Sequence, residues 1–255
     1  MRTVHCSALV AAVLVAGAAG QVTTGEIRVI SPGVVYNAGL LDLAAAFEKE
    51  RGIKVTVTSS GMGRIVNDIK TVTPAPDVMM LPFELMSTLS LDGGIKAGTF
   101  TPLGRSEMGL AVPAGARHPD ISTVEKLAAV LRGAKAVMRS NPAGGSMVAR
   151  VIEQNVIKRP EFAGVNSPVS TRGEGGQALA RGEGDMALQA ICEILPYKEI
   201  ELVGPLPREL AAWIDMATAV SARSTLLEDA LAFIRYITRR DATEIWTKKG
   251  LNRFL

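Results

Sequence analysis

Apolar runs of strand length and apolar faces of helical spacing alternate along the first third of the chain. Three runs predict strands: "EIRVIS" (26–31), "IKVTVTSS" (53–60) and "DVMML" (77–81). Gly52 ends a predicted helix between the first two runs, and the apolar face of that helix consists of Leu40, Leu43, Ala44 and Phe47. Another helical segment spans residues 64–70. This order predicts a parallel, doubly wound sheet.

The same alternation restarts in the second part of the chain. The predicted strands are "MGLAVP" (108–113), "AKAVM" (134–138), "DMALQ" (185–189) and "IDMATAV" (214–220). A helix over residues 122–133 is expected to begin with a capping box from Ser122 to Glu125. Two closing helices start at "STLLE" and "DATE", where Thr225 and Asp241 stand three residues before a glutamate.

The two halves predict an α/β protein of two doubly wound α/β domains, joined by a hinge and with a ligand cleft between them. Domain 1 is expected to comprise residues 25–104 together with 206–255, and domain 2 residues 105–205. Each half is near the minimum size of a domain. No Gly/Ser-rich or Pro-rich linker separates the halves in the sequence, so we expect short crossings between them.

The N-terminus has the pattern of a secretory signal peptide. Arg2 precedes an apolar run over residues 8–19, which is too short to span a bilayer, and cleavage is predicted after Gly20. The alternative is a buried N-terminal core helix, which Gly17 and Gly20 would interrupt. Residues 1–20 are thus a predicted signal peptide, and we expect a periplasmic protein that is monomeric and not embedded in the membrane.

Composition excludes several classes of function. The formal net charge is only +3 and aromatic residues make up 4% of the chain, which argues against a nucleic-acid partner. After cleavage Cys192 is the one remaining cysteine, so an internal disulfide is impossible and a buried thiol is expected. His118 is the one remaining histidine, which excludes zinc sites and triads that need histidine. We expect no metal and no cofactor.

Small polar residues follow several predicted strands, at the edge where open α/β sheets bind ligands. The segments are "SPGVV" (31–35), "SSGMGR" (59–64), "SNPAGGS" (140–146) and "QAICE" (189–193). In the first three, a serine with a glycine nearby stands where a helix begins. Free N–H groups of a first helical turn, together with hydroxyls, can hold an oxyanion or a carboxylate without much positive charge.

Each loop alone also has an ordinary structural explanation, because serine is a common N-cap and glycine a common turn residue. Their recurrence in both halves favours a shared anion site. The site is not one for nucleotides, since no P-loop is present and "GMG" lacks the Rossmann glycine spacing. The predicted ligand-binding residues are Ser31, Gly33, Ser59, Ser60, Gly61, Met62, Gly63, Arg64, Asn141, Ala143, Gly144, Gly145, Ser146 and Gln189.

Charged residues near these loops extend the candidate site. Arg64, Arg139 and Arg172 can each grip a ligand carboxylate bidentately, with a solvated surface position as the alternative for each. Glu174 and Glu193 are the nearest carboxylates, and either can act as acid or base only if it is buried. We expect both in solvated loops. The sequence therefore identifies no catalytic residue.

These features resemble the type II periplasmic solute-binding proteins, specifically the molybdate-binding-protein-like superfamily. The block "LLDLAAAFEKERGIKVTVTSSGMGRIVNDI" is the most specific part, while "IRVIS", "PAPDVMML", "NPAGGS" and "ALARGEGDMAL" agree in order and spacing. The resemblance covers nearly the whole mature chain. It implies that molybdate would be held by hydroxyls and amides at Ser31 and at Ser59 or Ser60, and by a tyrosine after the "GDMAL" strand.

Two residues depart from the molybdate pattern. Pro32 stands where a second hydroxyl residue is expected, and Ala190 stands at the tyrosine position. The segments "SPGVV", "SSGMG", "PDISTVEKL", "ARGEGDMALQAICEILP" and "IELVGPLP" are more similar to a branch that includes periplasmic aconitate isomerase. The double glutamine of that branch is only half kept, as Gln189-Ala190, and its "SSGG" is "SPGV" here. The ligand therefore stays open.

Three functional hypotheses follow from the loops and the resemblance. The first is a hinge-closing periplasmic protein that captures a small organic anion, a di- or tricarboxylate, with an ABC permease as partner if it serves transport. The second is a cofactor-free isomerase of aconitate type, which needs a base, anion-holding donors and no metal. The third is a molybdate or tungstate binder.

Overall fold

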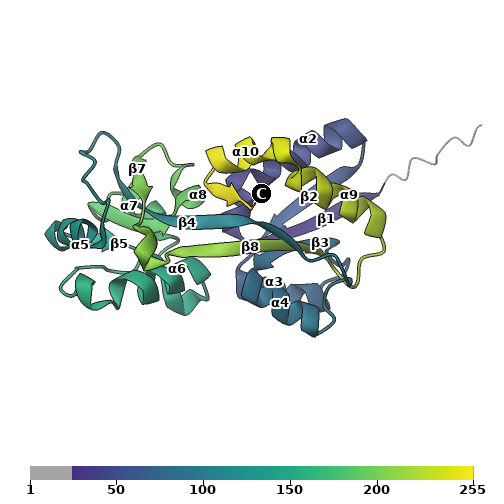
Figure 1. Cartoon of the computed structure of the whole chain (residues 1–255), viewed down its shortest axis with the longest axis horizontal. Helices are drawn as coiled ribbons and strands as arrows, with labels where there is room; N and C mark the ends of the chain where they lie inside the picture. The colour runs from purple at the N-terminus through teal and green to yellow at the C-terminus, as the bar shows by residue number, and fades with distance from the viewer. Residues whose placement is uncertain (1–24, 255) are drawn as a thin grey trace, which may run out of the picture.

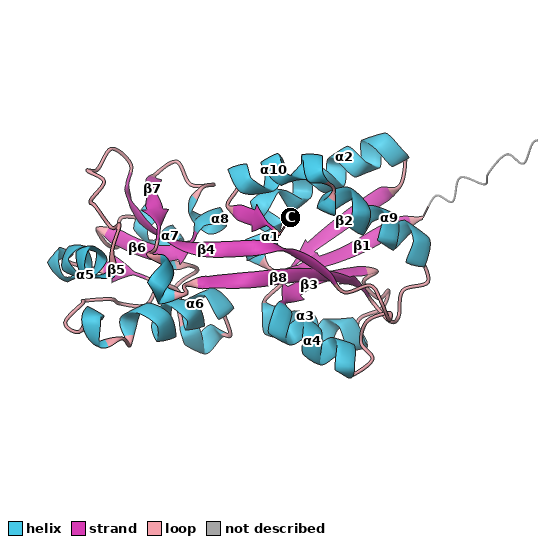
Figure 2. Ribbon diagram, viewed as in Figure 1, coloured by secondary structure: helices cyan, strands magenta, loops and turns pink. Residues whose placement is uncertain are grey.

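The computed structural model describes residues 25–254 and shows two lobes that lie side by side (Figure 1). The predicted signal peptide, residues 1–20, lies outside the described residues. In the described part, a nine-stranded sheet runs through both lobes and helices pack on it (Figure 2). The fold is mixed α/β with two lobes, as the alternating apolar patterns predicted.

The first lobe is built on three parallel strands and the helices that follow them. The strands are β1 (Glu26–Ser31), β2 (Lys54–Ser59) and β3 (Val78–Pro82). The helices are α1 (Gly33–Val35), a π-helical turn (Tyr36–Leu40), α2 (Leu41–Arg51), α3 (Met62–Thr71), α4 (Phe83–Leu91), α9 (Leu227–Thr238), a 3-10 turn (Arg240–Ala242) and α10 (Thr243–Lys248). Figure 1 shows α2, α9 and α10 on one face of the strands and α3 and α4 on the other.

β1 lies between β2 and β3 and is parallel to both. Its register with β2 pairs Ser31 with Ser59, so the loops that follow these two strands start next to each other. Gly52 ends α2 in the left-handed conformation (φ 68°), where a residue with a side chain would be strained. The parallel sheet and the glycine stop were both predicted from the sequence.

Two strands, β4 (Thr101–Pro113) and β8 (Trp213–Val220), join the second lobe to the first. The other strands of the second lobe are β5 (Val137–Met138), β6 (Met186–Ala190) and β7 (Ile200–Pro205), whereas β9 (Leu251–Arg253) pairs with the first half of β4. Residues 101–107 of β4 pair with β8, whereas residues 108–111 pair with β6. β4 and β8 run between the lobes in Figure 2. The proposed division into residues 25–104 plus 206–255 and residues 105–205 thus has its first boundary inside β4.

Helices and helical turns complete the second lobe. They are α5 (Val124–Gly133), a 3-10 turn (Pro142–Gly144), α6 (Met147–Ile152), a π-helical turn (Glu153–Ile157), a 3-10 turn (Pro160–Phe162), α7 (Gly175–Ala180), α8 (Ile191–Ile194) and a 3-10 turn (Arg208–Leu210). Within residues 25–254, no helix combines the length and the apolar character that crossing a bilayer requires.

Some element boundaries differ from the sequence-based expectation. β4 begins at Thr101 rather than Met108, because pairing with β8 and β9 recruits a segment whose Pro, Gly and Arg residues hide its strand character. The strand expected over residues 134–138 shrinks to two residues. The apolar pattern gave no indication of α4, β7 and β9 as elements, and packing in the folded sheet defines them.

The predicted helix caps are only partly right. Thr123, not Ser122, caps α5, and its side chain accepts a hydrogen bond from the Lys126 N–H at 3.3 Å. Neither α9 nor α10 has a side-chain cap, so the capping expected from Thr225 and Asp241 is wrong. α9 begins at Leu227, one residue later than a Thr225 cap predicts, and α10 continues the 3-10 turn Arg240–Ala242, which already includes Asp241.

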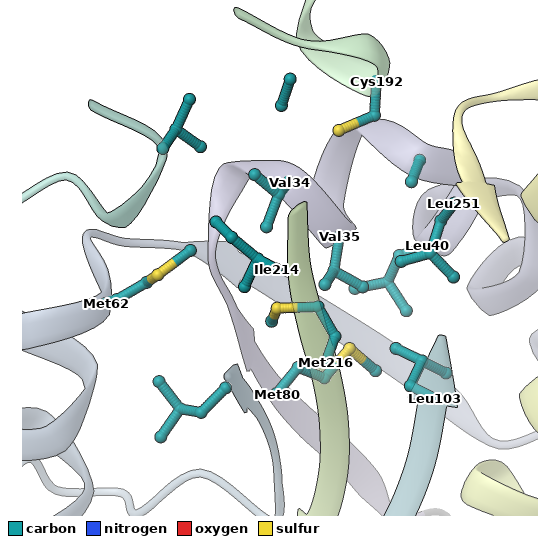
Figure 3. Packing of buried hydrophobic residues seen from close by; sticks show 14 of the residues in the cluster. Val34, Val35, Leu40, Met62, Met80, Leu103, Cys192, Ile214, Met216 and Leu251 are labelled. Carbon is teal, nitrogen blue, oxygen red and sulfur yellow. The ribbon is translucent and has the colours of Figure 1, made fainter. Parts of the chain in front are cut away.

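One cluster of buried hydrophobic residues extends through both lobes. Figure 3 shows part of it, with labelled side chains from the first helical run, α3, β3, β4, α8, β8 and β9 converging around the crossing strands. Cys192 is a free, buried thiol in this cluster, as expected. A smaller cluster in the second lobe includes Ala178 and Leu179 of α7. The lobes are therefore linked by core packing as well as by β4.

Phe47 offers a test of the first lobe's core. It is fully buried on α2, and its ring meets Phe233 and Tyr236 edge-on with centroid distances of 5.3 and 5.1 Å. We expect Phe47→Ala to lower the free energy of unfolding by about 3–5 kcal/mol, because it leaves a cavity in packed surroundings. Urea unfolding measures the change. Leu91→Ala, at a side chain that is 89% exposed, is the control and should change stability by less than about 0.5 kcal/mol. Equal stability losses in the two variants would contradict this description of the core.

Candidate functional site

A cavity of about 500 Å³ lies between the lobes, beyond the carboxyl ends of β1, β2 and β6. Both lobes contribute to its wall. The lining residues are Pro32, Gly33, Val34, Ser59, Ser60, Gly61, Met62, Ser140, Asn141, Gly145, Ser146, Met147, Val148, Ser170, Thr171, Gly173, Glu174 and Glu193. Hydroxyls, glycines and helix starts dominate this wall, which is the chemistry that the sequence loops predicted.

The first lobe presents backbone N–H groups to the cavity. Gly61 is the N-cap of α3 and has no side chain to cap the helix, so the first-turn N–H groups stay available to a ligand. The helical run that starts at Gly33 has its first hydrogen bonds at Val35 and Tyr36, whose N–H groups donate to Pro32 O. The N–H groups of Gly33 and Val34 come before the first hydrogen bonds of this run, so they also stay available to a ligand. Ser59 and Ser60 add hydroxyls beside them.

The second lobe presents polar side chains that also shape its own loops. Ser146 caps α6 by accepting a hydrogen bond from the Ala149 N–H at 3.2 Å, and its hydroxyl hydrogen remains free to donate. Asn141 Oδ1 accepts a hydrogen bond from the Ala143 N–H at 2.9 Å. Gly145 has a φ of 79°, which suits glycine in the turn between these two residues. Hydrogen bonds within the loop and to the start of α6 thus hold these residues at the cavity wall.

Two carboxyl groups enter the cavity from the second lobe. Glu174 is the N-cap residue of α7, and Glu193 lies on α8 with only 4% of its surface exposed. Burial, together with the charge of Glu174, raises the pKa of Glu193 to about 8. Burial also raises the pKa of Glu174. The pair therefore keeps at least one proton at neutral pH, and the expectation of a solvated Glu193 is wrong.

The three candidate arginines lie outside the cavity wall. Arg64 forms an exposed ion pair with Asp68 at 3.3 Å. Arg139 pairs with Glu153 at 2.6 Å, and Arg172 is exposed. Within residues 25–254, the cavity lining contains no Lys, Arg or His. An anion in this cavity would have to be held by neutral donors.

The structure brings together only part of the predicted ligand-binding set. The predicted residues that line the cavity are Gly33, Ser59, Ser60, Gly61, Met62, Asn141, Gly145 and Ser146. Those outside its lining are Ser31, Gly63, Arg64, Ala143 and Gln189, whereas Gly144 lies outside the residues whose side-chain surroundings the structure describes. Ser31 is fully buried, and its hydroxyl donates to Pro32 O at 3.1 Å. Gln189 lies outside the cavity lining, and its amide donates a hydrogen bond to the carboxyl of Glu193, which does line the cavity.

One stretch of the wall was not predicted at all. Ser170, Thr171 and Gly173 come from the loop before α7. The signal was present in the sequence, because "STRGEGG" (170–176) has the same Ser, Thr and Gly content before a helix as the other anion loops. What the sequence could not show is that this loop faces the same cavity as "SSGMGR".

Known proteins resemble the chain over nearly its whole length. The family model of bacterial extracellular solute-binding proteins matches residues 27–252. An aconitate isomerase from Pseudomonas sp. is 27% identical over 239 residues, which cover 92% of this chain and 89% of that protein. Because the match covers nearly all of both chains, the two proteins are expected to share the same fold from end to end.

Solved structures share the fold. A substrate-binding domain from Clostridium difficile, assigned to a molybdenum ABC transporter, matches with a TM-score of 0.73 and 13% identity over 90% of this chain and 99% of that one. The periplasmic molybdate-binding protein of Azotobacter vinelandii matches with a TM-score of 0.69 and 17% identity over 90% and 100% of the two chains. The two-domain fold with a cavity between the lobes, together with the family match, shows that this chain belongs to the bacterial extracellular solute-binding protein family.

Proposed function

We propose that the cavity binds a small di- or tricarboxylate and shifts a proton between two allylic carbons of that ligand, an aconitate-type isomerisation without a cofactor. The observation that carries the proposal is the carboxyl pair of Glu174 and Glu193 in a wall whose other residues are uncharged. A site that only captured an anion gains nothing from two carboxyl groups, because an ionised one repels the ligand, whereas proton transfer needs both an acid and a base. The 27% identity to a Pseudomonas aconitate isomerase supports the same conclusion.

The carboxyl pair supplies both groups that a 1,3 proton shift needs. Glu193 is protonated below a pH of about 8, and Glu174 is the neighbour that can be ionised. Ionised Glu174 removes a proton from the saturated allylic carbon, and the C–H electron pair forms the new double bond. The electrons of the old double bond take the Glu193 proton at the far carbon. One proton exchange between the two carboxyls then restores the starting state.

Neutral donors would hold the carboxylates of the ligand. The hydroxyls of Ser59, Ser60 and Ser146 and the N–H groups at the starts of α1 and α3 surround the cavity. Such donors stabilise a carboxylate and the negative charge that spreads onto it when a neighbouring carbon loses a proton. The wall therefore supplies binding, and the carboxyl pair supplies the proton transfer.

Capture of a small anion for an ABC permease is the second candidate, and membership of the solute-binding family favours it. The protein would work as a periplasmic monomer after removal of residues 1–20. Binding without turnover is the signature of this function. Molybdate or tungstate is a further possible ligand for a capture protein, and a thermal-shift measurement with each oxyanion checks it; the absence of any shift would remove this ligand class.

An ultraviolet assay on the purified protein tests the isomerase proposal. Wild-type protein should interconvert trans- and cis-aconitate well above background. Glu193→Gln should lower turnover by about 100-fold or more while ligand affinity stays within a few-fold, because general acid–base groups contribute about 10²–10⁴-fold. Glu199→Gln is the control at an exposed acid and should leave turnover unchanged. Wild-type protein that binds aconitate without converting it would leave capture as the function.

Ligand affinity should depend on pH through Glu193. Burial and the charge of Glu174 raise the pKa of Glu193 to about 8, so its carboxyl is neutral below that pH. Above it, ionisation places a negative charge beside the ligand, and affinity should fall by up to about tenfold per pH unit. Calorimetric titration with aconitate from about pH 6 to 9 measures the slope. Glu193→Gln should flatten it, and a flat slope in the wild type would mean that Glu193 does not face the ligand.

Ser60 tests the first lobe's part of the site. Ser60→Ala removes a hydroxyl from the cavity wall beside α3 and should weaken ligand affinity by about 1 kcal/mol, roughly fivefold, while the melting temperature stays nearly constant. Ser90→Ala, at an exposed serine of α4, is the matched control. Calorimetry on both variants decides the point. Identical affinities would place the ligand away from α3.

A further inference from the structure

Gln189 is a buried amide with a partner on each side. It lies near the end of β6 with 1% of its surface exposed, and a buried amide is costly unless it is hydrogen-bonded. Its Oε1 accepts a hydrogen bond from Ser140 Oγ at 2.9 Å. Its Nε2 donates to Glu193 Oε2 at 2.5 Å. Gln189 is thus absent from the cavity wall but in contact with a group that lines it.

The orientation of this amide is set by Gly175. The Gly175 N–H donates to Ser140 Oγ at 3.2 Å, which leaves the hydroxyl hydrogen of Ser140 for Gln189 Oε1. A Cβ on Gly175 would lie 2.5 Å from Arg139 Cα, so only glycine allows α7 to come this close. A flipped amide would place Nε2 against Ser140 and take away Oε1, the acceptor of the Ser140 hydroxyl hydrogen. The network therefore directs Nε2 of Gln189 towards Glu193.

This orientation decides which oxygen of Glu193 carries the proton. Oε2 accepts a hydrogen bond from Gln189, so the proton belongs on Oε1. Oε1 lies 3.0 Å from the place that a Cβ on Gly33 would take, which puts it against the opposite lobe at the cavity wall. Glu174 of α7 is the charged group that faces Glu193, whereas α1 and β6 present the uncharged Gly33 and Gln189 to it.

We propose that Gln189 is a positioning residue that keeps the proton of Glu193 on Oε1, where the carboxyl can pass it to the ligand. The delivery step rests on the proposed isomerase function. The placement of the proton rests only on the Gly175, Ser140 and Gln189 hydrogen bonds. It can therefore be tested even if the protein only binds its ligand.

The first arm of the test needs no ligand. Gln189→Met keeps the length of the side chain and removes both hydrogen-bonding groups. In protein with ¹³C-labelled glutamate carboxyls, the NMR signal of Glu193 is assigned by its loss in Glu193→Gln. The Gln189 donor lowers the pKa of Glu193, so Gln189→Met should raise the titration midpoint by about half a pH unit or more. Gln154→Met, at an exposed glutamine, is the control and should not move it.

An unchanged midpoint in Gln189→Met overturns the inference. If that variant fails to fold, Ser140→Ala takes its place, since it frees the amide to flip and should raise the midpoint in the same direction. The second arm measures aconitate turnover, where kcat of Gln189→Met should fall about tenfold or more with KM within about twofold. A wild type without turnover ends the isomerase proposal and leaves the midpoint to decide the role of Gln189. Wild-type turnover with an unchanged kcat in Gln189→Met overturns the inference.

Discussion

The pairing of β4 with two different neighbours is the constraint on which the rest of the molecule depends. Its residues 101–107 pair with β8, and its residues 108–111 pair with β6. The register of Met108 with Ala190 therefore fixes the segment that carries Gln189 and Glu193 relative to the first lobe. A Cβ on Gly104 would lie 2.5 Å from Asn252 O, so glycine is what allows β9 to pack against the crossing strand. β4 thus fixes the position of the second wall of the cavity relative to the first.

The sequence was informative where a local pattern and the final structure agree. The strand ending at Ser31, the strand ending at Ser59 and the helix ended by Gly52 all follow from apolar spacing and turn chemistry, and these elements place the first wall of the cavity. β4 was recognised only from Met108 onward, because its first half gains its strand conformation from its partners. Local pattern thus predicted the fold class and the strand ends of the first wall, and long-range pairing decided how the lobes join.

The candidate site shows the same division. Serine and glycine before a helix could be read from the sequence, and six such predicted residues, together with Met62 and Asn141, meet in the cavity. The character of Glu193 could not be read, because "QAICEILP" contains nothing that distinguishes a buried glutamate from a solvated one. Its burial results from α8 packing between β6 and the start of the first helical run. Arg64 is the opposite case: the sequence made it a candidate for binding the ligand, but in the structure it pairs with Asp68 on the surface.

Glu193 differs from two other partly buried acids, Asp215 and Glu153, in the groups that surround its carboxyl. Asp215 forms an ion pair with Arg105 at 2.7 Å, and Glu153 forms one with Arg139 at 2.6 Å, so each has a cation as its partner. Glu193 has an amide and a second carboxyl as neighbours, and it stays buried by remaining protonated. Such an arrangement costs stability whenever the group ionises. A fold that only needed to fill this place could use an apolar residue or a paired acid, and for this reason the proposed isomerisation assigns the Glu193 proton a role in the cavity.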